Sequence, residues 1–492
     1  MSEAERKARA ERLAALRATG ADPYPASVGP LVRLADVRAR WDALDAAALE
    51  ADPPPAIAVA GRVMAIRSFG KLVFMTLRED GASLQVSFRK PELAPAALET
   101  LGLVDVGDFV RAEGVVWRTR TGELTVGATS LRVVSKSLHP MPEKWHGLVD
   151  VEARYRQRYL DLLVNEEARR IAVTRSRVIT AMRAFLDGRG FLEVETPVLQ
   201  PLYGGAHARP FSTHYEAYDQ DVFLRISDEL YLKRLVIGGL DRVYEIGHNF
   251  RNEGVSRKHN PEFTMMECYQ AFADYRDMME LVQSMFQHVV VSVTGGTRVT
   301  FREHEIEFGG EWPRIAICDA LRDRIGIDVL AAPDFESLYA RVLEKGLDPG
   351  DAPTWGQLVD HLFSEHVEPT LIQPTLVTNH PVELSPLAKR SSEDPRLVER
   401  FEPFVAGMEL GNAFSELNDP ADQRARFEEQ RAMHAAGDAE AHPLDEDFLL
   451  AMEHGMPPTG GLGVGIDRLV IVLTDAQHIR EVLLFPYMRP ES

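Results

Sequence analysis

The chain has very little cysteine and no long apolar run. Only two cysteines occur among 492 residues, Cys268 and Cys318, and neither belongs to a CxxC or Cys/His pattern that would bind zinc. The sequence therefore predicts neither disulfides nor structural zinc, which is typical of a reducing compartment. No stretch approaches the ~20 consecutive apolar residues that span a bilayer. The first residues are charged and lack the apolar core of a secretory signal, so we expect a cytoplasmic protein without a membrane partner.

Two common nucleotide-binding fingerprints are also missing, although one segment is rich in glycine. Residues 459–473 read TGGLGVGIDRLVIVL. The segment contains no GxxxxGK[ST], and its glycines follow GxGxG rather than GxGxxG, so it indicates neither a P-loop nor a Rossmann turn. The glycines instead precede an apolar helix that opens with Asp467 and Arg468. Because arginine can bind a phosphate bidentately and glycines let a backbone approach a substrate, the segment is a candidate phosphate site of another kind.

Negative charge exceeds positive charge in the chain as a whole, with 75 Asp and Glu against 55 Lys and Arg. The formal net charge of −20 at pH 7 excludes a uniformly basic surface but leaves room for a local basic face that contacts nucleic acid. Residues 57–137 have the opposite sign, with eleven Lys and Arg against eight Asp and Glu, a balance of +3. Aromatic and cationic side chains lie close together there, a combination that stacks unpaired bases; an ordinary core position is the alternative for each aromatic ring. These residues are Arg67, Phe69, Lys71, Phe74, Trp117 and Arg118.

The pattern of the sequence divides the chain into four stretches. Residues 1–56 contain a charged amphipathic helix followed by ADPPP, and are predicted to be a helical arm and linker. Residues 57–138 contain five short β-type segments and one helical segment, a pattern that suits an OB-fold barrel. Residues 139–170 are predicted to be a linker. Residues 171–492 form the large domain, which begins with a helix over residues 171–188 and a strand in FLEVETPVL.

The run FRNEGVSRKHNPEFTMMECYQ, residues 250–270, predicts the loop and second strand of an antiparallel hairpin, with Arg251 at the end of the first strand. The two-residue period of a strand places Phe263, Glu267 and Tyr269 on one face with Met265. Phe263 and Glu267 would lie about 13 Å apart along it. A ring and a carboxylate at opposite ends of one cleft suit a two-part substrate. The alternative, a half-buried strand with a solvent carboxylate, explains the methionine better than the glutamate.

A second group of polar residues lies in GMELGNAFSELND, residues 407–419. Asn412, Phe414 and Glu416 share one face at period two. Glu402 and Glu409 are candidate ligands for Mg²⁺, which binds nucleotide phosphates together with one or two carboxylates. Strand parity points Glu409 away from Asn412, unless the chain bends at the intervening glycine.

These segments together resemble the three signature motifs of the class II aminoacyl-tRNA synthetases. In chain order they are GFLEVETPVL with Pro197, FRNEG…HNPEF and GLGVGIDRL. The class I signatures HIGH and KMSKS are absent. Further strings resemble the lysyl-tRNA synthetases of bacterial type, and the resemblance runs from about residue 57 to residue 490: EARYRQRYLDL, GGAHARPF, ELYLKRL, HNPEFTMMECYQAFADY, LSPLAKR and ELGNAFSELNDP.

The resemblance implies a fold, a reaction and partners. The fold would be an α+β catalytic domain built on an antiparallel sheet, preceded by an OB-fold that binds the anticodon. The activity would be that of a lysine-tRNA ligase: L-lysine reacts with ATP, the co-substrate, to give lysyl-adenylate and pyrophosphate, and lysine then passes to the 3′-terminal adenosine of tRNA(Lys). Mg²⁺ would be the cofactor, and the chain would form a homodimer in the cytoplasm.

The resemblance also assigns roles to residues. The ATP-binding set is Arg251, Glu253, His259, Phe263 and Arg468, of which Arg251 and Arg468 would be catalytic. The lysine-binding set is Gly205, Glu229, Glu267, Tyr269, Asn412, Phe414 and Glu416, with Glu267, Tyr269 and Glu416 around the ε-ammonium. Glu402 and Glu409 would bind the metal, and Arg67, Phe74 and Glu123 would read the anticodon. The chain departs from the family at His248, where arginine is common, and at Ala413, where glycine also occurs.

Three other functions share parts of this pattern. Lysylation of a protein such as elongation factor P uses a similar catalytic domain, but such relatives lack the barrel, so residues 57–137 count against it. A pseudo-enzyme or regulatory RNA-binding protein would have lost Arg251, Arg468 or the paired Glu267 and Glu416, and all are present. Diadenosine polyphosphate synthesis stays open as a side activity. The paired glutamates predict selectivity for a cation, because two buried carboxylates are costly without one.

Overall fold

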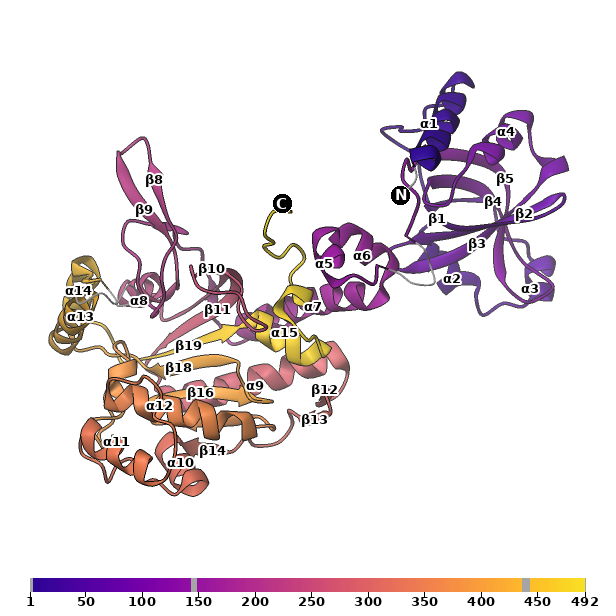
Figure 1. The fold of residues 1–492 in the computed structure, drawn as a ribbon. Helices are drawn as coiled ribbons and strands as arrows, with labels where there is room; N and C mark the ends of the chain where they lie inside the picture. The colour runs from indigo at the N-terminus through magenta and orange to yellow at the C-terminus, as the bar shows by residue number, and fades with distance from the viewer. Residues whose placement is uncertain (1–2, 143–147, 436–442, 492) are drawn as a thin grey trace. The chain divides into compact units, whose positions relative to one another are not determined.

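The computed structural model describes residues 3–142, 148–435 and 443–491. The chain forms two compact units, residues 1–146 and residues 147–492 (Figure 1). Of the predicted linker, residues 143–147 lie outside the described part.

The first unit contains a closed five-stranded barrel with the strand order β1-β2-β3-β5-β4. Alternate residues of β1 face inward, which is the burial pattern expected of a barrel strand. A 3-10 turn and a helix lie between β3 and β4. The predicted OB-fold is therefore confirmed. The elements are β1 (Ile57–Phe69), β2 (Leu72–Glu79), β3 (Ala82–Arg89), η1 (Lys90–Glu92), α4 (Pro95–Leu103), β4 (Phe109–Arg118) and β5 (Leu124–Ser135).

Residues 3–56, which belong to the expected arm and linker, are packed on the barrel. They form α1 (Glu3–Ala18), α2 (Leu34–Trp41) and α3 (Ala46–Ala51). Leu16, Leu34 and Leu49 are buried in the same apolar core as the barrel strands. One leucine from each helix thus anchors these segments, which the charged sequence of α1 did not indicate.

The second unit is built on a nine-stranded sheet. Its order is β14-β15-β16-β18-β19-β11-β10-β6, with β17 paired to β16. All neighbours are antiparallel except β14 with β15 and β6 with β10, so the predicted antiparallel sheet is confirmed. The strands are β6 (Leu192–Glu193), β10 (Arg242–Phe250), β11 (Glu262–Ala271), β14 (Arg314–Ala316), β15 (Thr375–Thr378), β16 (Arg400–Val405), β17 (Met408–Glu409), β18 (Gly411–Ser415) and β19 (Thr459–Gly465).

Three helices cover one face of this sheet (Figure 1). They are α7 (Glu166–Gly188), α9 (Tyr275–Thr294) and α15 (Ile466–Thr474). Helix α7 begins earlier than the expected residues 171–188, because the Asn165 side chain accepts a hydrogen bond from the Glu167 backbone N–H and caps it. On the opposite face, α8 (Glu229–Ile237) packs through Leu232 and Val236 against β10 and β11.

The strand predicted in FLEVETPVL is interrupted. Only Leu192–Glu193 pair in parallel with β10, and Leu199–Gln200 form β7 in a separate small sheet. Between them, the backbone N–H and the hydroxyl of Thr196 both donate to the Glu245 carboxylate, at 3.0 and 2.7 Å. A side chain thus replaces the strand ladder at this point, and Pro197, which has no N–H, follows.

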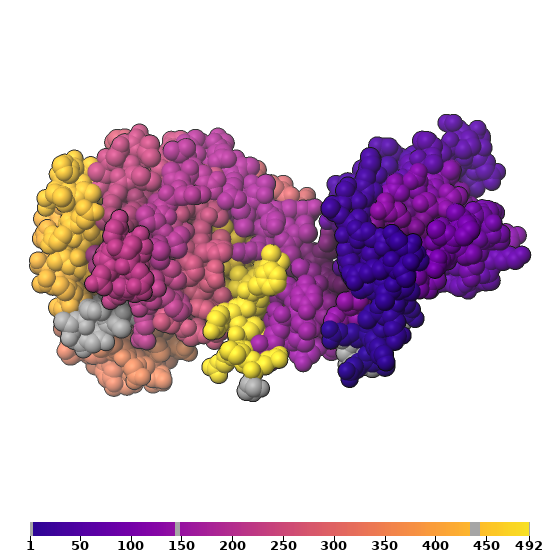
Figure 2. Space-filling view, turned by 90° about the horizontal axis from the view of Figure 1, so that it is seen from above, coloured from indigo at the N-terminus to yellow at the C-terminus, as the bar shows by residue number. Residues whose placement is uncertain are grey.

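The remaining elements surround the sheet. They are α5 (Val151–Arg156), α6 (Arg158–Val164), β8 (Ser212–Tyr215), β9 (Gln220–Leu224), β12 (Arg298–Phe301), β13 (His304–Glu307), α10 (Ile317–Ile325), α11 (Phe335–Glu344), α12 (Trp355–His366), η2 (Glu368–Thr370), η3 (Val382–Leu384), α13 (Pro420–Ala435), α14 (Glu446–Glu453) and α16 (Ile479–Val482). The segment after α16 runs over the surface of this unit (yellow in Figure 2). None of the helices in the described ranges combines the length and apolarity needed to cross a bilayer.

A buried ion cluster ties β5 to the turn before β4. Lys136 has no exposed side-chain surface, and its Nζ lies 2.7 Å from Asp108 and 2.6 Å from Asp105. Removing one partner of such a cluster leaves uncompensated buried charge. We expect Lys136→Met to lower the free energy of unfolding of the barrel by about 3–5 kcal/mol, measured by denaturant-dependent hydrogen exchange of β1 and β4 in the full-length protein.

The matched control is Arg33→Met. Arg33 pairs with Asp80 at 3.0 Å, but both side chains are more than half exposed. We expect that control to change stability by less than about 1 kcal/mol. Equal effects of the two substitutions would contradict a role for burial in the Lys136 cluster.

Candidate active site

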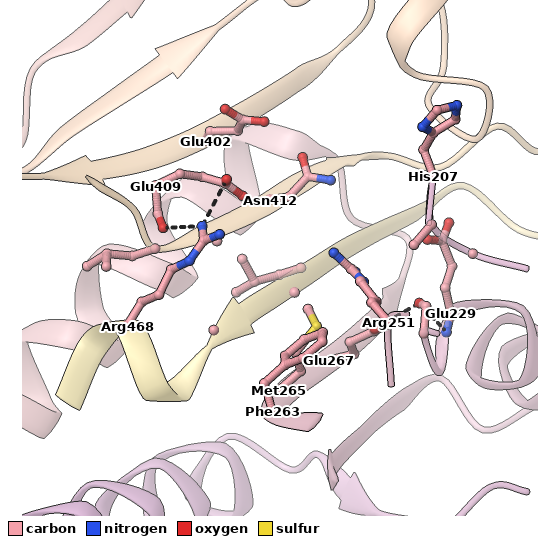
Figure 3. Close-up of a pocket in the computed structure, with 18 of the residues that line it drawn as sticks. His207, Glu229, Arg251, Phe263, Met265, Glu267, Glu402, Glu409, Asn412 and Arg468 are labelled. Carbon is pink, nitrogen blue, oxygen red and sulfur yellow. Dashed lines mark hydrogen bonds and ion pairs between the residues drawn. The ribbon is translucent and has the colours of Figure 1, made fainter. Parts of the chain in front are cut away.

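A cavity of about 370 Å³ lies on the sheet face opposite α7 and α9 (Figure 3). Strand β11 shows how the sequence builds it. The predicted alternation is present: Phe263, Met265, Glu267 and Tyr269 line the cavity, whereas Met266 and Cys268 belong to the apolar core beneath the helices. The cavity also receives side chains from β16, β17, β18, β19 and α8, so segments from both sequence halves of the unit meet there.

Glu267 is a buried carboxylate held by three donors. It accepts hydrogen bonds from the Ser227 hydroxyl at 2.8 Å, the Tyr269 hydroxyl at 3.1 Å and the Asp228 backbone N–H at 3.3 Å. Burial, and next the negative charge of Glu229, raise its pKa to about 7. The three donors oppose that rise, so the site keeps the carboxylate ready to ionise near neutral pH.

Two further carboxylates at this end share one ammonium. The Nζ of Lys233 lies 2.5 Å from Glu229 and in direct ion-pair contact with Glu416, and the Lys233 and Glu416 side chains have no exposed surface. Burial raises the pKa of Glu416 and of Glu229, against the opposing charge of Lys233. Burial alone would lower the pKa of Lys233, but the two carboxylates outweigh it and raise that pKa.

The glycines of β19 make room for these side chains. A Cβ on Gly461 would lie 1.9 Å from Oε1 of Glu416 and 2.7 Å from Tyr269. A Cβ on Gly465, in contrast, would meet only ordinary contacts with Arg468. From the sequence, the glycine run was interpreted as space for a phosphate. At Gly461 the carboxylate of Glu416 occupies that space.

Arg251 points into the middle of the cavity (Figure 3). Its guanidinium lies 5.1 Å from the centre of the Phe263 ring. Within the described ranges of the chain, no carboxylate lies within ion-pairing distance of it. Burial lowers its pKa, although Glu253, Glu267 and Glu409 favour the charged form. A half-buried guanidinium without a paired carboxylate is free to bind an anion.

The far end of the cavity contains Glu402 and Glu409, each paired with an arginine. Arg400 Nη2 lies 2.5 Å from Glu402 Oε1, and Arg468 Nη1 lies 3.0 Å from Glu409 Oε2. Phe404 of β16 stands opposite Glu409, so Glu402, two residues away, shares that face. Burial raises the pKa of Glu402 to about 8, whereas Arg468 and Arg400 outweigh burial at Glu409 and lower its pKa.

The strand parity that separated Glu409 from Asn412 is broken at Leu410, which lies between two strands and directly before Gly411. Strand β17 ends at Glu409 and β18 begins at Gly411, and a Cβ there would lie 2.5 Å from the Gly463 carbonyl oxygen. Glu409 and Asn412 consequently line the same cavity. The bend considered from sequence is present.

Asn412 has a fixed orientation. Its Oδ1 accepts a hydrogen bond from Arg400 Nε at 2.8 Å. Since an N–H of Arg400 can only meet the amide oxygen, the amide nitrogen of Asn412 is left as a donor. Arg400 therefore orients Asn412 and also holds Glu402.

The other residues of the expected set also line this cavity: Gly205, Glu253, His259 and Phe414. His259 Nε2 lies 3.2 Å from Arg468 Nη2, and Lys233 Nζ lies 5.5 Å from the Phe414 ring. Sequence reasoning missed Lys233, Arg400, Ser227 and His207. The Glu229–Lys233 spacing of four residues on one helix was the available signal for the first; none was available for His207.

Both departures from the family pattern point away from the cavity. His248 Nδ1 lies 2.8 Å from Glu262 at an exposed edge of β10 and β11. Ala413 is fully buried in the core under the helices.

The barrel residues form a separate polar face on β1 and β2. Arg67 and Phe74 are directly paired across the strands, and Arg67 Nη2 donates to Gln85 Oε1 at 2.8 Å. The neighbouring Phe69 is 65% exposed, which excludes a core position for that ring. Glu123 is exposed and pairs with Arg38 of α2 at 3.2 Å.

Glu402 and Glu409 fit a magnesium ion bound together with a nucleotide better than a metal site whose ligands all come from the protein. No group of three or more His, Cys, Asp or Glu side chains suitable for a metal occurs in the part of the chain that the structure describes. Mg²⁺ is commonly held by one or two carboxylates together with substrate phosphates. Glu402 and Glu409, facing the same cavity end, match that donor set.

Family models agree with both units. Residues 150–489 match tRNA synthetases class II (D, K and N), and residues 57–134 match the OB-fold nucleic acid binding domain. Fold and cavity thus define a class II aminoacyl-tRNA synthetase.

Full-length relatives identify the family within this class. The chain is 52% identical over 480 residues to the lysine–tRNA ligase of Dehalococcoides mccartyi strain 195, covering 97% of this chain and 96% of that protein. It is 51% identical over 486 residues to that of Roseiflexus castenholzii, with 98% of each covered, and 50% identical over 490 residues to that of Pelotomaculum thermopropionicum, with 99% and 95% covered. The chain belongs to the lysine–tRNA ligase family.

The state of Glu267 predicts how lysine binding depends on pH. A neutral carboxylic acid cannot pair with an ammonium, so lysine affinity should fall as the pH drops through the Glu267 pKa of about 7. We expect the dissociation constant of lysine to rise between pH 8 and pH 6, approaching about tenfold per pH unit at the acid end. Calorimetric titration checks this.

Glu267→Gln provides the control, since its amide does not titrate. We expect that variant to bind lysine weakly, without this pH dependence. Equal pH profiles for the two proteins would assign the titration to another group, such as His259 in the same cavity.

Proposed function

We propose that the cavity activates lysine, with the amino acid at the Glu229–Glu267–Glu416 end and ATP at the Arg468 end. The observation that carries this proposal is the order of charge along one cavity: buried carboxylates, then the guanidinium of Arg251, then two arginine-paired carboxylates. Lysine has two ammonium groups and one carboxylate, and ATP continues with phosphates. The charge order of the cavity is complementary to that of the two substrates placed end to end.

The reaction needs positioning more than a protein nucleophile. An oxygen of the lysine carboxylate attacks the α-phosphorus of ATP, the bond from that phosphorus to the bridging oxygen breaks, and pyrophosphate leaves. Arg251 would bind the α-phosphate and the lysine carboxylate, with the Asn412 amide donating to the carboxylate. Phe263 would stack on adenine beside Glu253 and His259. Arg468 would bind the γ-phosphate.

Glu402 and Glu409 would hold Mg²⁺ with the phosphates. A bound divalent cation neutralises phosphate charge and lowers the barrier to displacement. Burial raises the pKa of Glu402 to about 8, and a bound cation would favour the ionised form of this carboxylate.

The barrel supports tRNA(Lys) as the acceptor. Arg67, Phe74 and Glu123 would contact anticodon bases, and the exposed Phe69 extends the aromatic surface beside them. Relatives that lysylate a protein lack this barrel, so its presence disfavours that alternative. Transfer of lysine would go to the 3′-terminal adenosine.

A homodimer in the cytoplasm completes the proposal. Leu192 and Leu199, in the first signature segment, are 51% and 53% exposed, an unusual state for leucines at the edge of a sheet. A second copy covering this segment would remove that apolar surface from water. Both cysteines are free and buried, which agrees with a reducing compartment.

Loss of the Arg251 guanidinium should abolish activation. We expect Arg251→Ala to reduce lysine-dependent ATP–pyrophosphate exchange by roughly 10²–10³-fold, with the fold intact by circular dichroism. The wild-type protein should exchange with lysine and far less with ornithine, arginine or aspartate. Near-normal turnover of the variant would remove Arg251 from the role, and equal exchange with aspartate would refute lysine selection by the carboxylates.

Substitutions in the barrel should affect the binding of tRNA and not the activation of lysine. We expect Phe74→Ala to raise the KM for tRNA(Lys) roughly tenfold while ATP–pyrophosphate exchange stays at the wild-type rate. Arg132→Ala, at an exposed position on β5, is the matched control and should change neither. An unchanged KM for tRNA in Phe74→Ala would exclude this face as the anticodon site.

A further inference from the structure

Lys233 lies behind the wall of the cavity and does not line it. Its side chain is fully buried, and its Nζ bridges Glu229 and Glu416, which do line the cavity. The lysine comes from α8 and Glu416 follows β18, so the contact joins two distant parts of the sequence. The Phe414 ring covers the ammonium at 5.5 Å. A buried lysine without a path to solvent can be charged only because of these two carboxylates.

The formal charges near the amino-acid end can be counted. Glu229, Glu267 and Glu416 contribute −3 when ionised, and Lys233 reduces this to −2. Lysine brings two ammonium groups, which is +2, while its carboxylate lies toward the guanidinium of Arg251. The pocket charge of −2 and the +2 of the two ammonium groups therefore cancel.

The charged groups beside the pocket have partners of their own. Arg225 forms buried ion pairs with Glu245 at 2.5 Å and with Asp228 at 3.1 Å. Burial, and then Glu267, raise the pKa of Asp228 and favour its neutral form, while Arg225 opposes that rise. Arg400 acts on Glu229 from a distance but is already paired with Glu402. Tyr269 stays protonated because burial raises its pKa.

We propose that Lys233 is a specificity-determining positioning residue, which fixes the pocket charge at −2 and holds Glu416 and Glu229 ionised to receive a substrate with two ammonium groups. This inference rests on the proposed lysine site. Without Lys233, three desolvated carboxylates would face one another, and one of them would take up a proton. The net charge would again be −2, but the proton would sit on a carboxylate that faces the cavity, whereas Lys233 lies behind it. A neutral acid cannot pair with an ammonium, so lysine would bind tightly only after that proton left.

Proton release distinguishes this role from a merely structural one. Lysine binding is measured by calorimetry at pH 8 in buffers of different ionisation enthalpy. We expect wild-type protein to release close to no protons and Lys233→Met to release about one. The lysine dissociation constant of the variant should rise roughly 30-fold or more, with ATP binding unchanged. Wild-type affinity without proton release in Lys233→Met would overturn the proposal.

A double variant tests the charge count by restoring the pocket charge instead of changing it. It also provides a test if Lys233→Met does not fold. Glu416→Gln alone leaves a pocket charge of −1, by the count above, whereas Glu416→Gln with Lys233→Met restores −2. Replacing both partners of a buried pair by neutral groups of similar shape is also well tolerated. We expect the double variant to bind lysine more tightly than Glu416→Gln. Weaker or equal binding would overturn the proposal.

Lys345→Met is the matched control. Lys345 is an exposed lysine at the end of α11, outside the cavity, and its loss should change neither affinity nor proton release. Lysine-dependent ATP–pyrophosphate exchange by the wild-type protein, measured in parallel, separates the two hypotheses. Absence of that exchange would reject the proposed function itself, whereas normal exchange with unaltered Lys233 variants would reject only the role of Lys233.

Discussion

The desolvation of carboxylates is the constraint on which the rest of the site depends. Glu229, Glu267 and Glu416 are all nearly inaccessible to water, so each must have a cation, a set of donors or a proton. The protein meets this need in two ways: hydrogen-bond donors around Glu267, and one shared ammonium between the other two. What stays uncompensated is negative charge, and this charge is complementary to a diamine and not to an apolar or acidic amino acid. In the proposed site, selectivity for lysine would then follow from electrostatics more than from shape.

Arginines have the corresponding task in the proposed ATP site, and they also connect the two ends of the cavity. Arg400 orients the Asn412 amide with its Nε and pairs with Glu402 through Nη2, so one guanidinium positions both a group proposed to face the lysine carboxylate and a group proposed to bind metal. Arg468 is held by the Glu409 carboxylate and backbone carbonyl, which fixes it before any phosphate arrives. Such preorganisation reduces the reorganisation needed when charge develops on the phosphate oxygens. Arg251 differs from both, because it lacks a paired carboxylate and is therefore available to the reacting groups.

The sequence predicted those parts of the site that depend on strand periodicity. The face of β11 that lines the cavity was predicted correctly, because a long, regular strand obeys period two. The barrel was predictable for the same reason. The sequence predicted less where a side chain replaced a backbone partner: Glu245 interrupts the strand predicted around Thr196, and nothing local indicates it. The contact of Lys233 with Glu416 could not be predicted from the sequence either, since it forms only when α8 and the end of β18 are brought together in space. The resemblance to a family assigned the residues, but it did not indicate which carboxylates the protein itself would neutralise.

The glycines of β19 show how one segment meets several constraints at once. Gly461 is required by Glu416 and Tyr269, and a Cβ on Gly463 would lie 3.2 Å from Met265. Gly465, the residue before α15, meets no such obstacle. Side chains are therefore excluded from the strand beside Glu416 and Tyr269, and less strictly beside Arg468, the arginine proposed to bind phosphate. A glycine-rich sequence before an arginine suggests a phosphate loop; here its steric origin lies mainly in the packing of the protein's own carboxylate. The same absence of side chains that admits Glu416 also sets its carboxylate within reach of Lys233, so backbone composition and pocket charge are two consequences of one packing arrangement.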